Sequence, residues 1–256
     1  MNKRAHLTLL PPLLLILCGV LPVARADDPP AIGAQADRIL REMSEYLQSL
    51  EQFTFNSDVF YDSVMVSGQK IQYGGNGKIS VHRPNRLRVE YREEEGGLTV
   101  VFNGDIFTLH DLGANFYAQK DMTVDIDTAV DRMFETFGFS VPTADLIYSD
   151  PYTSLIASVD SGFVVGQYEM QGVRCHHLAF SQETIDWQIW IEDGPRPLPR
   201  RLLITYKNEP GSPQYAAELS GWDLRPHLSD AYFEFHPPSG AGRIEFLPTE
   251  EGETTP

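Results

Sequence analysis

The run Cys175–His176–His177 carries the side chains of this chain that are best suited to chemistry. A thiolate and two imidazoles are typical zinc ligands. On an extended strand, neighbouring side chains point to opposite faces, so Cys175 and His177 could converge while His176 could not. Two ligands do not complete a zinc site. We therefore interpret the run as core packing with a satisfied histidine, because a single cysteine buries readily as a small hydrophobe.

A group of aspartates resembles the start of a calcium-binding loop: Asp125, Asp127 and Asp131. Such a loop needs glycine at its sixth position and glutamate at its twelfth. Val130 and Thr136 stand there instead. The cluster is better explained as the start of a helix, where acidic side chains complement the helix dipole and cap free N–H groups.

Four arginines recur between residues 83 and 92: Arg83, Arg86, Arg88 and Arg92. Such a strip could receive a phosphate or the acidic patch of a partner. Glu90 and residues 93–95 lie beside it, so a solvated strand face fits equally well.

No nucleophile elbow, zinc-protease motif, P-loop or dinucleotide fingerprint occurs in the sequence. We predict no catalytic residue, no metal and no cofactor. A hydrolase that uses His176 or His177 with an acid is kept as the weakest alternative.

The first 26 residues have the form of a cleaved signal peptide. Lys3 and Arg4 precede the apolar run of residues 7–21, and Ala24–Arg25–Ala26 has the small-x-small form of a cleavage site. We expect export to the periplasm with cleavage before Asp27. The run is short of the ~20 residues that a membrane span needs, which argues against stable membrane insertion.

Lipid attachment at Cys18 is a further alternative, but Leu17 stands where a lipoprotein signal needs a small residue. Cleavage would remove three basic residues and no acid, so the net charge would change from −16 to −19. A surface this acidic excludes nucleic acid as a partner and repels anionic lipid head groups. Cys175 would then be the single cysteine, so no internal disulfide can form.

Short extended runs dominate the first half of the chain. Between residues 78 and 119 four of them are closed by turn residues at 83–85, 95–97, 103–105 and 111–113. Asn103–Gly104 predicts a tight hairpin of type I′, which needs positive φ at both central positions. In residues 53–61 apolar side chains alternate with polar ones, which predicts a half-buried strand. Glycines 74, 75 and 77 predict a bulge or a sharp bend.

Helical patterns occur in two places. Residues 34–50 place apolar side chains at the three-and-four spacing of an amphipathic helix packed on a sheet. Residues 121–159 are apolar and helix-prone, with short helices expected at 141–146 and 151–159. We expect this second segment, which we call the lid, to cover the concave face of the sheet.

Strands resume after residue 162 as a second meander: 162–170, 173–182, 185–192, 200–207 and 214–224. Residues 231–235 predict a last short strand. We expect a mobile leader at 27–33, a single domain at 34–247, and a disordered acidic tail at 248–256.

These elements resemble the LolA/LolB-like superfamily of periplasmic lipoprotein localisation factors. The resemblance rests on G-K-I-S-V-H-R-P-N at 77–85, F-N-G-D-I-F-T-L-H-D at 102–111 and D-A-Y-F-E-F-H-P-P-S-G at 230–240. Residues 149–152, 175–178 and 187–194 are more similar to an uncharacterised periplasmic branch of that superfamily.

The resemblance implies a mainly β α+β fold, an unclosed and strongly curved antiparallel half-barrel with helices as a lid over an apolar cavity. In the carriers that cavity holds acyl chains, and the arginine of R-P-N, here Arg83, contacts backbone carbonyls of the lid. The lid is longer and more acidic here than in the carriers, and the Cys-His-His strand has no counterpart in them. The resemblance therefore supports apolar-ligand binding more than lipoprotein transport.

We predict a periplasmic binding or carrier protein for a lipid or a lipoprotein acyl chain. The alternative is a sensor or an envelope-assembly module with a protein partner. Large aromatics also dominate ordinary cores, so cavity lining and core packing stay open as alternatives for Trp187, Trp190, Phe55, Phe102 and Phe107. The candidate cavity and lid residues are Arg83, Phe55, Phe102, Phe107, Phe134, Phe137, Leu146, Trp187 and Ile189.

Overall fold

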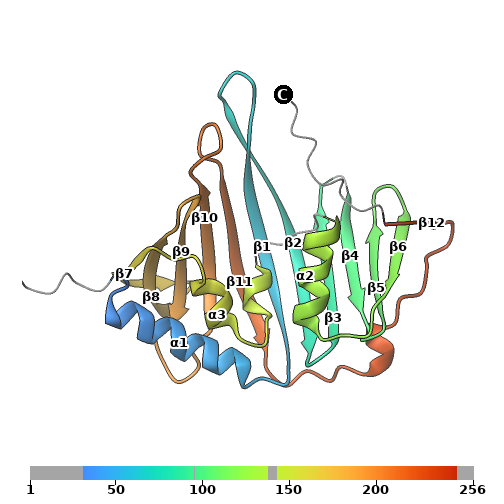
Figure 1. Cartoon of the computed structure of the whole chain (residues 1–256), viewed down its shortest axis with the longest axis horizontal. Coiled ribbons are helices and arrows are strands. Elements are labelled where there is room, and N and C mark those ends of the chain that lie inside the picture. Colours follow the sequence, from blue (N-terminus) through green and yellow to red (C-terminus); the bar gives the residue numbers. More distant parts are fainter. Residues whose placement is uncertain (1–30, 95, 138–142, 247–256) are drawn as a thin grey trace, which may run out of the picture.

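The computed structural model describes residues 31–94, 96–137 and 143–246 (Figure 1). Within them the strands form one twelve-stranded sheet in the order β12-β6-β5-β4-β3-β2-β1-β11-β10-β9-β8-β7. β7 and β12 are its two edges, so the sheet is an unclosed half-barrel, and the predicted fold class is confirmed. The strands are β1 (Gln52–Val64), β2 (Lys70–His82), β3 (Arg86–Glu93), β4 (Gly96–Phe102), β5 (Ile106–Asp111), β6 (Phe116–Asp121), β7 (Ser161–Met170), β8 (Val173–Ser181), β9 (Ile185–Glu192), β10 (Pro199–Tyr206), β11 (Gln214–Asp223) and β12 (Gly242–Ile244).

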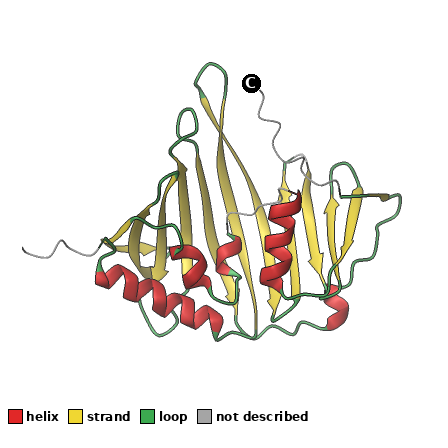
Figure 2. Ribbon diagram, viewed as in Figure 1, coloured by secondary structure: helices red, strands yellow, loops and turns green. Residues whose placement is uncertain are grey.

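The longer helices cover one face of this sheet, which we call the inner face (Figure 2). They are α1 (Ala34–Gln48), α2 (Ile126–Phe137) and α3 (Pro151–Ile156), with the short 3₁₀ turn η1 (Ala144–Leu146) between the last two. α1 lies across the β7 side of the sheet, and α2 lies across the β2 and β3 side (Figure 1). The lid therefore lies on the inner face, where it was expected, although residues 141–142 of the predicted helix at 141–146 fall outside the described part.

The alternation in β1 decides which side chains meet the helices. Phe53, Phe55, Val59 and Tyr61 point to the inner face, and the first three of these are buried. β1 pairs with β2 on one side and β11 on the other, and so joins the two meanders. This central strand brings apolar side chains from both halves of the chain to one surface.

The last residues of the predicted leader form backbone hydrogen bonds with the sheet. Gly33 N donates to Gly162 O at 2.8 Å, and Gly162 N donates to Ala31 O at 3.0 Å. Residues 31–33 thus pair with the edge strand β7. The predicted signal peptide (1–26), the rest of the leader and the tail (248–256) lie outside the described residues.

The hairpin at Asn103–Gly104 is present, but it is not the predicted type I′ turn. Gly104 has a φ of 96°, whereas Asn103 is not among the residues with positive φ. The Asn103 side-chain oxygen instead accepts from Asp105 N at 3.1 Å and Ile106 N at 2.9 Å. The asparagine therefore closes the turn with its side chain rather than with a left-handed backbone.

Of the two alternatives predicted at glycines 74, 75 and 77, the bulge is wrong, because β2 pairs with β1 and with β3 without a register shift. The glycines make room instead. A Cβ at Gly75 would lie 2.5 Å from the Tyr91 hydroxyl and 2.5 Å from Arg92 O, and one at Gly74 would lie 2.8 Å from Val59 O.

The prediction of a strand at 231–235 is also wrong. The backbone forms a 3₁₀ turn, η2 (Asp230–Phe233), and the chain then runs on to β12, which pairs in parallel with β6. Residues 224–246, which we call the C-terminal segment, contribute Phe233 (0% exposed) to the protein interior. Alternating aromatics suggested a strand, but here they anchor an irregular segment.

Phe233→Ala tests whether the C-terminal segment belongs to the cooperative fold. Truncating a fully buried Phe costs about 3–5 kcal/mol, so the urea-unfolding midpoint should fall strongly. The control is Phe163→Ala on β7, where the side chain is 60% exposed and the loss should be small. Equal midpoints for the two variants would show that this segment is not part of the folded core.

Candidate ligand pocket

A cavity of about 420 Å³ lies between the inner face and the lid helices. Its walls come from β1 to β5, β10 and β11, and its cover from α2 and η1. The volume falls within the range of about 300–1,000 Å³ that is usual for small-molecule sites. Most of the lining is apolar or aromatic: Phe55, Val59, Ile79, Leu87, Val89, Tyr91, Leu98, Val100, Phe107, Val130, Met133, Ala144, Ile147, Tyr206, Pro213 and Tyr215, with Tyr61.

The two ends of the pocket differ. Phe55, Phe107 and Met133 are at most 1% exposed and form a fully apolar end. The other end has Tyr61, Tyr91, Tyr206 and Tyr215, which we call the tyrosine end, and these side chains are half-buried. Tyr61 ends the alternating pattern of β1, so its inward direction follows from the sequence.

The tyrosines keep their protons at neutral pH. Burial raises the pKa of Tyr91 to about 12, and neighbouring Glu93 and Tyr61 add to the effect. Burial also raises the pKa of Tyr215, and both burial and Glu209 raise that of Tyr206. The pKa of Tyr61 is raised by burial and by its hydrogen bond to Glu93, whose carboxylate accepts at 3.1 Å. The tyrosine end therefore presents neutral hydroxyls.

Few other polar groups reach the pocket. The charged residues that line it are Asp62 and Glu209, and no Lys, Arg or His is among the described lining residues. Asp62 accepts from Gln214 N at 3.1 Å and lies 3.6 Å from Lys70 Nζ. The Ser57 hydroxyl is buried in the wall and has no hydrogen-bond partner among the described residues. A buried hydroxyl without a hydrogen-bond partner lowers stability, because its lost hydrogen bonds to water are not replaced.

Arg83 joins the sheet to the lid. Its Nη1 donates to Ile147 O at 2.9 Å and its Nη2 donates to Tyr148 O at 2.9 Å. The guanidinium also lies 5.7 Å from the centre of the Phe53 ring. Burial lowers the pKa of Arg83, and nearby Asp127 opposes that effect. One fixed pair of donors thus satisfies two carbonyls just after η1, which is the contact that the resemblance implies.

The carboxylates of the lid accept hydrogen bonds from other residues of the lid. Asp125 Oδ1 accepts from Thr128 N at 2.9 Å, which caps the start of α2. Asp127 accepts from Ser149 N at 3.0 Å, and Asp131 from the Tyr148 hydroxyl at 2.7 Å. These contacts tie α2 to the segment that Arg83 holds. In the described ranges, no group of three or more His, Cys, Asp or Glu side chains could hold a metal ion.

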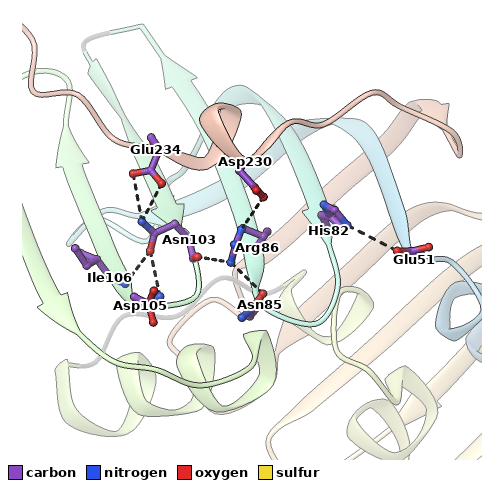
Figure 3. A network of polar contacts seen from close by, with 9 residues as sticks. All are labelled: Glu51, His82, Asn85, Arg86, Asn103, Asp105, Ile106, Asp230 and Glu234. Atoms are coloured by element: carbon purple, nitrogen blue, oxygen red, sulfur yellow. Dashed lines mark hydrogen bonds and ion pairs between the residues drawn. The ribbon is translucent and has the colours of Figure 1, made fainter.

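Arg86 and Arg88 lie on the outer face and bind the C-terminal segment, and Figure 3 shows the contacts of Arg86. Arg86 Nε lies 3.6 Å from Asp230, while its Nη1 donates to Asn85 and to Asn103 O. Arg88 Nη1 donates to Tyr232 O at 3.2 Å. Arg86 and Arg88 of the predicted basic strip therefore make their contacts within the chain. Neither of them lines the pocket.

The Cys-His-His run also lies away from the pocket. Cys175 is fully buried, and burial raises the pKa of its thiol to about 11. His177 stacks on Trp190 with ring centres 4.1 Å apart and pairs with the Gln188 side chain at 2.8 Å. His176 Nε2 lies 3.3 Å from Asp193. Each histidine thus has its own partner on a different face of β8.

The other predicted cavity residues divide into three groups. Phe55 and Phe107 line the pocket. Phe102, Leu146, Trp187 and Ile189 are buried in the surrounding core and do not line it. Phe134 is 57% exposed and points away from it, whereas the half-buried Phe137 stacks on Phe246 with ring centres 5.0 Å apart. Tyr91, Tyr206 and Tyr215 were not among the candidates predicted from the sequence. Each lies an even number of residues along its strand from a buried side chain and therefore points to the same face.

A family model described as "Predicted periplasmic protein (DUF2092)" matches residues 36–247. The chain belongs to this family. It is therefore a periplasmic protein, as predicted, and the resemblance to an uncharacterised periplasmic branch is confirmed at the level of family and fold. In the part of the chain that the structure describes, no helix has both the length and the apolar character needed to cross a membrane. No curated protein matches the chain.

Several solved structures are similar at low identity. An uncharacterised conserved protein from Thermus thermophilus is 13% identical, with 82% of this chain and 99% of that chain covered and a TM-score of 0.48. The lipoprotein LppX from Mycobacterium tuberculosis is 11% identical, with 76% and 98% covered and a TM-score of 0.47. A LolA superfamily protein from Nitrosomonas europaea is 11% identical, with 78% and 97% covered and a TM-score of 0.39.

Arg83→Met tests the link between sheet and lid. The substitution keeps the apolar stem and removes both donors, and charge-assisted hydrogen bonds are worth about 1.5–3 kcal/mol. We expect a loss of that order in unfolding free energy and faster amide exchange in residues 143–156. Arg38→Met, which removes an exposed i,i+4 pair on α1, is the control. Unchanged exchange in the lid of Arg83→Met would contradict the assigned role.

Asp145→Asn tests a buried lid carboxyl. Burial raises the pKa of Asp145, although the Ser154 hydroxyl donates to it. The folded protein thus holds this proton more tightly than the unfolded chain, and stability is lost as pH rises above the unfolded value of 3.8.

The Asn variant should therefore be more stable than the parent at pH 7, and the difference should vanish below pH 3.8. Urea unfolding at the two pH values measures it, with the exposed Asp160→Asn as a charge-matched control. A parent that is more stable than Asp145→Asn at pH 7 would contradict the burial effect.

Proposed function

We propose that this protein binds an apolar ligand, a lipid or a lipoprotein acyl chain, in the pocket under the lid helices and carries it in the periplasm. One observation supports this most: a cavity of about 420 Å³ under the lid whose lining is mostly apolar. Cores normally pack with few voids larger than a water molecule. A hollow of this size at the centre of the inner face is therefore suited to an occupant.

Burial of the acyl chain supplies the binding energy. Each CH₂ group removed from water is worth about 0.8 kcal/mol, and part of that gain is lost in ordering the chain. The apolar end at Phe55, Phe107 and Met133 would receive the methyl end of the chain. The tyrosine end would then meet its polar part.

The lid gives the site a means of entry and release. Moving η1 away from the sheet breaks the two hydrogen bonds of Arg83 to Ile147 and Tyr148. Arg83 thus biases the lid towards the closed state without touching the ligand. A bound chain would also contact Val130, Met133 and Ile147 of the lid, so binding would favour closure as well.

The sensor or assembly-partner function stays a hypothesis, and so does the hydrolase. Neither His176 nor His177 lines the pocket, so a hydrolase would need a second site. The sensor or assembly-partner hypothesis requires that a partner protein co-purify with this protein from the cell envelope.

Val89→Trp tests the proposal by filling the pocket. Val89 lines the cavity and is only half-buried, so the larger indole should occupy the hollow and compete with a ligand. We expect the affinity for an uncharged fluorescent probe with a long alkyl chain to fall by at least about tenfold, or ~1.4 kcal/mol. The matched control is Val165→Trp on β7, where the side chain is 50% exposed.

Circular dichroism melts establish that both variants fold. Equal probe affinity for folded Val89→Trp and the parent would place binding elsewhere. No probe binding by the parent would contradict the proposed function itself.

A further inference from the structure

We infer that the tyrosine end selects the head group of the ligand, and that the pocket takes an amphipath with a cationic, ammonium-type head. This rests on the proposed function, because it names the polar part of the molecule whose chain the pocket holds. The inference comes from the chemistry of the one end of the cavity that is not apolar.

The first observation is the sign of the charge. Asp62 and Glu209 are the charged residues of the lining, and Glu93 accepts from Tyr61 beside them. Lys70 is the cation that contacts this group, at 3.6 Å from Asp62, and it also donates to Ser212 O at 2.9 Å. Three carboxylates against one ammonium leave the tyrosine end acidic, which repels an anionic head and attracts a cationic one.

The second observation is the aromatic surface. Four tyrosines converge here, and Tyr61 also stacks with Tyr73 at 5.8 Å. Aromatic faces together with carboxylates are the usual surroundings of ammonium ligands, since the ring quadrupole attracts a cation. The raised pKa values keep the rings neutral, so their hydroxyls also accept and donate hydrogen bonds.

The third observation is independent of the first two. Ser57 lies in the pocket wall and is 3% exposed, and its hydroxyl has no hydrogen-bond partner among the described residues. A polar group left unpaired in an otherwise apolar wall points to an occupant that carries a polar atom. The ligand is therefore an amphipath rather than a pure hydrocarbon.

The opposite interpretation, an anionic head such as a carboxylate or phosphate, needs a cation in the lining. The arginines nearest in sequence are used elsewhere: Arg83 binds lid carbonyls, and Arg86 and Arg88 lie on the outer face. Arg92, which follows Tyr91, is not among the lining residues and lies instead in a separate hollow with Asp58 and Glu90. Lys207, next to Tyr206, lies 3.0 Å from Asp186 and is thereby neutralised. The described lining offers an anion no ionic partner.

The test compares three ligands with the same twelve-carbon chain, below their micellar concentrations: dodecyltrimethylammonium, dodecyl maltoside and dodecyl sulfate. Calorimetric titration of the protein without its signal peptide should show the cationic ligand binding at least about tenfold more tightly than the other two, a difference of ~1.4 kcal/mol. Val89→Trp should lower the affinity for all three ligands, which would show that they bind in the pocket.

The net charge of the whole protein also favours cations, so a matched pair of variants separates the local effect. Asp62→Asn/Glu209→Gln should remove most of the preference for the ammonium ligand. Glu42→Gln/Glu45→Gln changes the net charge equally on the exposed face of α1, far from the tyrosine end, and should retain it.

The outcomes separate the two proposals. Equal affinities for the three head groups, or tighter binding of dodecyl sulfate or the maltoside, would overturn the head-group inference and leave the carrier function standing. An equal loss of preference in both double variants would also overturn it. No binding of any of the three ligands would contradict the proposed function.

Discussion

The inner face of the sheet is an apolar surface that the helices cover incompletely, and most features of the molecule follow from this. Twelve strands present inward-facing side chains along the whole sheet, whereas the described helices that cover them are short apart from α1. Where α1 lies on the β7 side, the surface is filled: Phe180 and Trp187 stack with ring centres 4.2 Å apart. Under α2 and η1 the apolar surface is not filled, and the hollow lies there.

Closing this hollow requires polar contacts, because apolar packing alone cannot fill it. Arg83 satisfies two carbonyls of the lid, and Asp127 and Asp131 bind the same stretch from α2. The cover is therefore held in two ways: by these hydrogen bonds, and by Ile126, Met133 and Leu146, which are buried in the apolar core. Opening the lid would break the hydrogen bonds and expose part of that apolar surface.

The outer face is stabilised differently. There the C-terminal segment crosses the strands and is bound by Arg86 and Asn103 (Figure 3) and by Arg88. Phe233 is its apolar anchor. Phe246, further along, reaches Phe137 at the end of α2. The segment thus joins the outer face to the lid around the β6 edge.

Local patterns predicted the strands and α1 because alternation and helical spacing are set by neighbours in sequence. They could not tell pocket from core. Trp187 and Phe55 stand in equally apolar strands, and only the helix that packs above each strand decides whether its side chain meets protein or a hollow. The strand expected at residues 231–235 failed for a related reason, since alternating aromatics also suit an irregular segment that inserts one ring into the interior.

The central claim is that the hollow is built to be occupied. Native mass spectrometry of the protein isolated from its own periplasm, without detergent, tests it most directly. The account predicts a discrete added mass that extracts into organic solvent, and a Val89→Trp protein that lacks it. A bare polypeptide mass for the parent, with no lipid in the extract, would contradict the account.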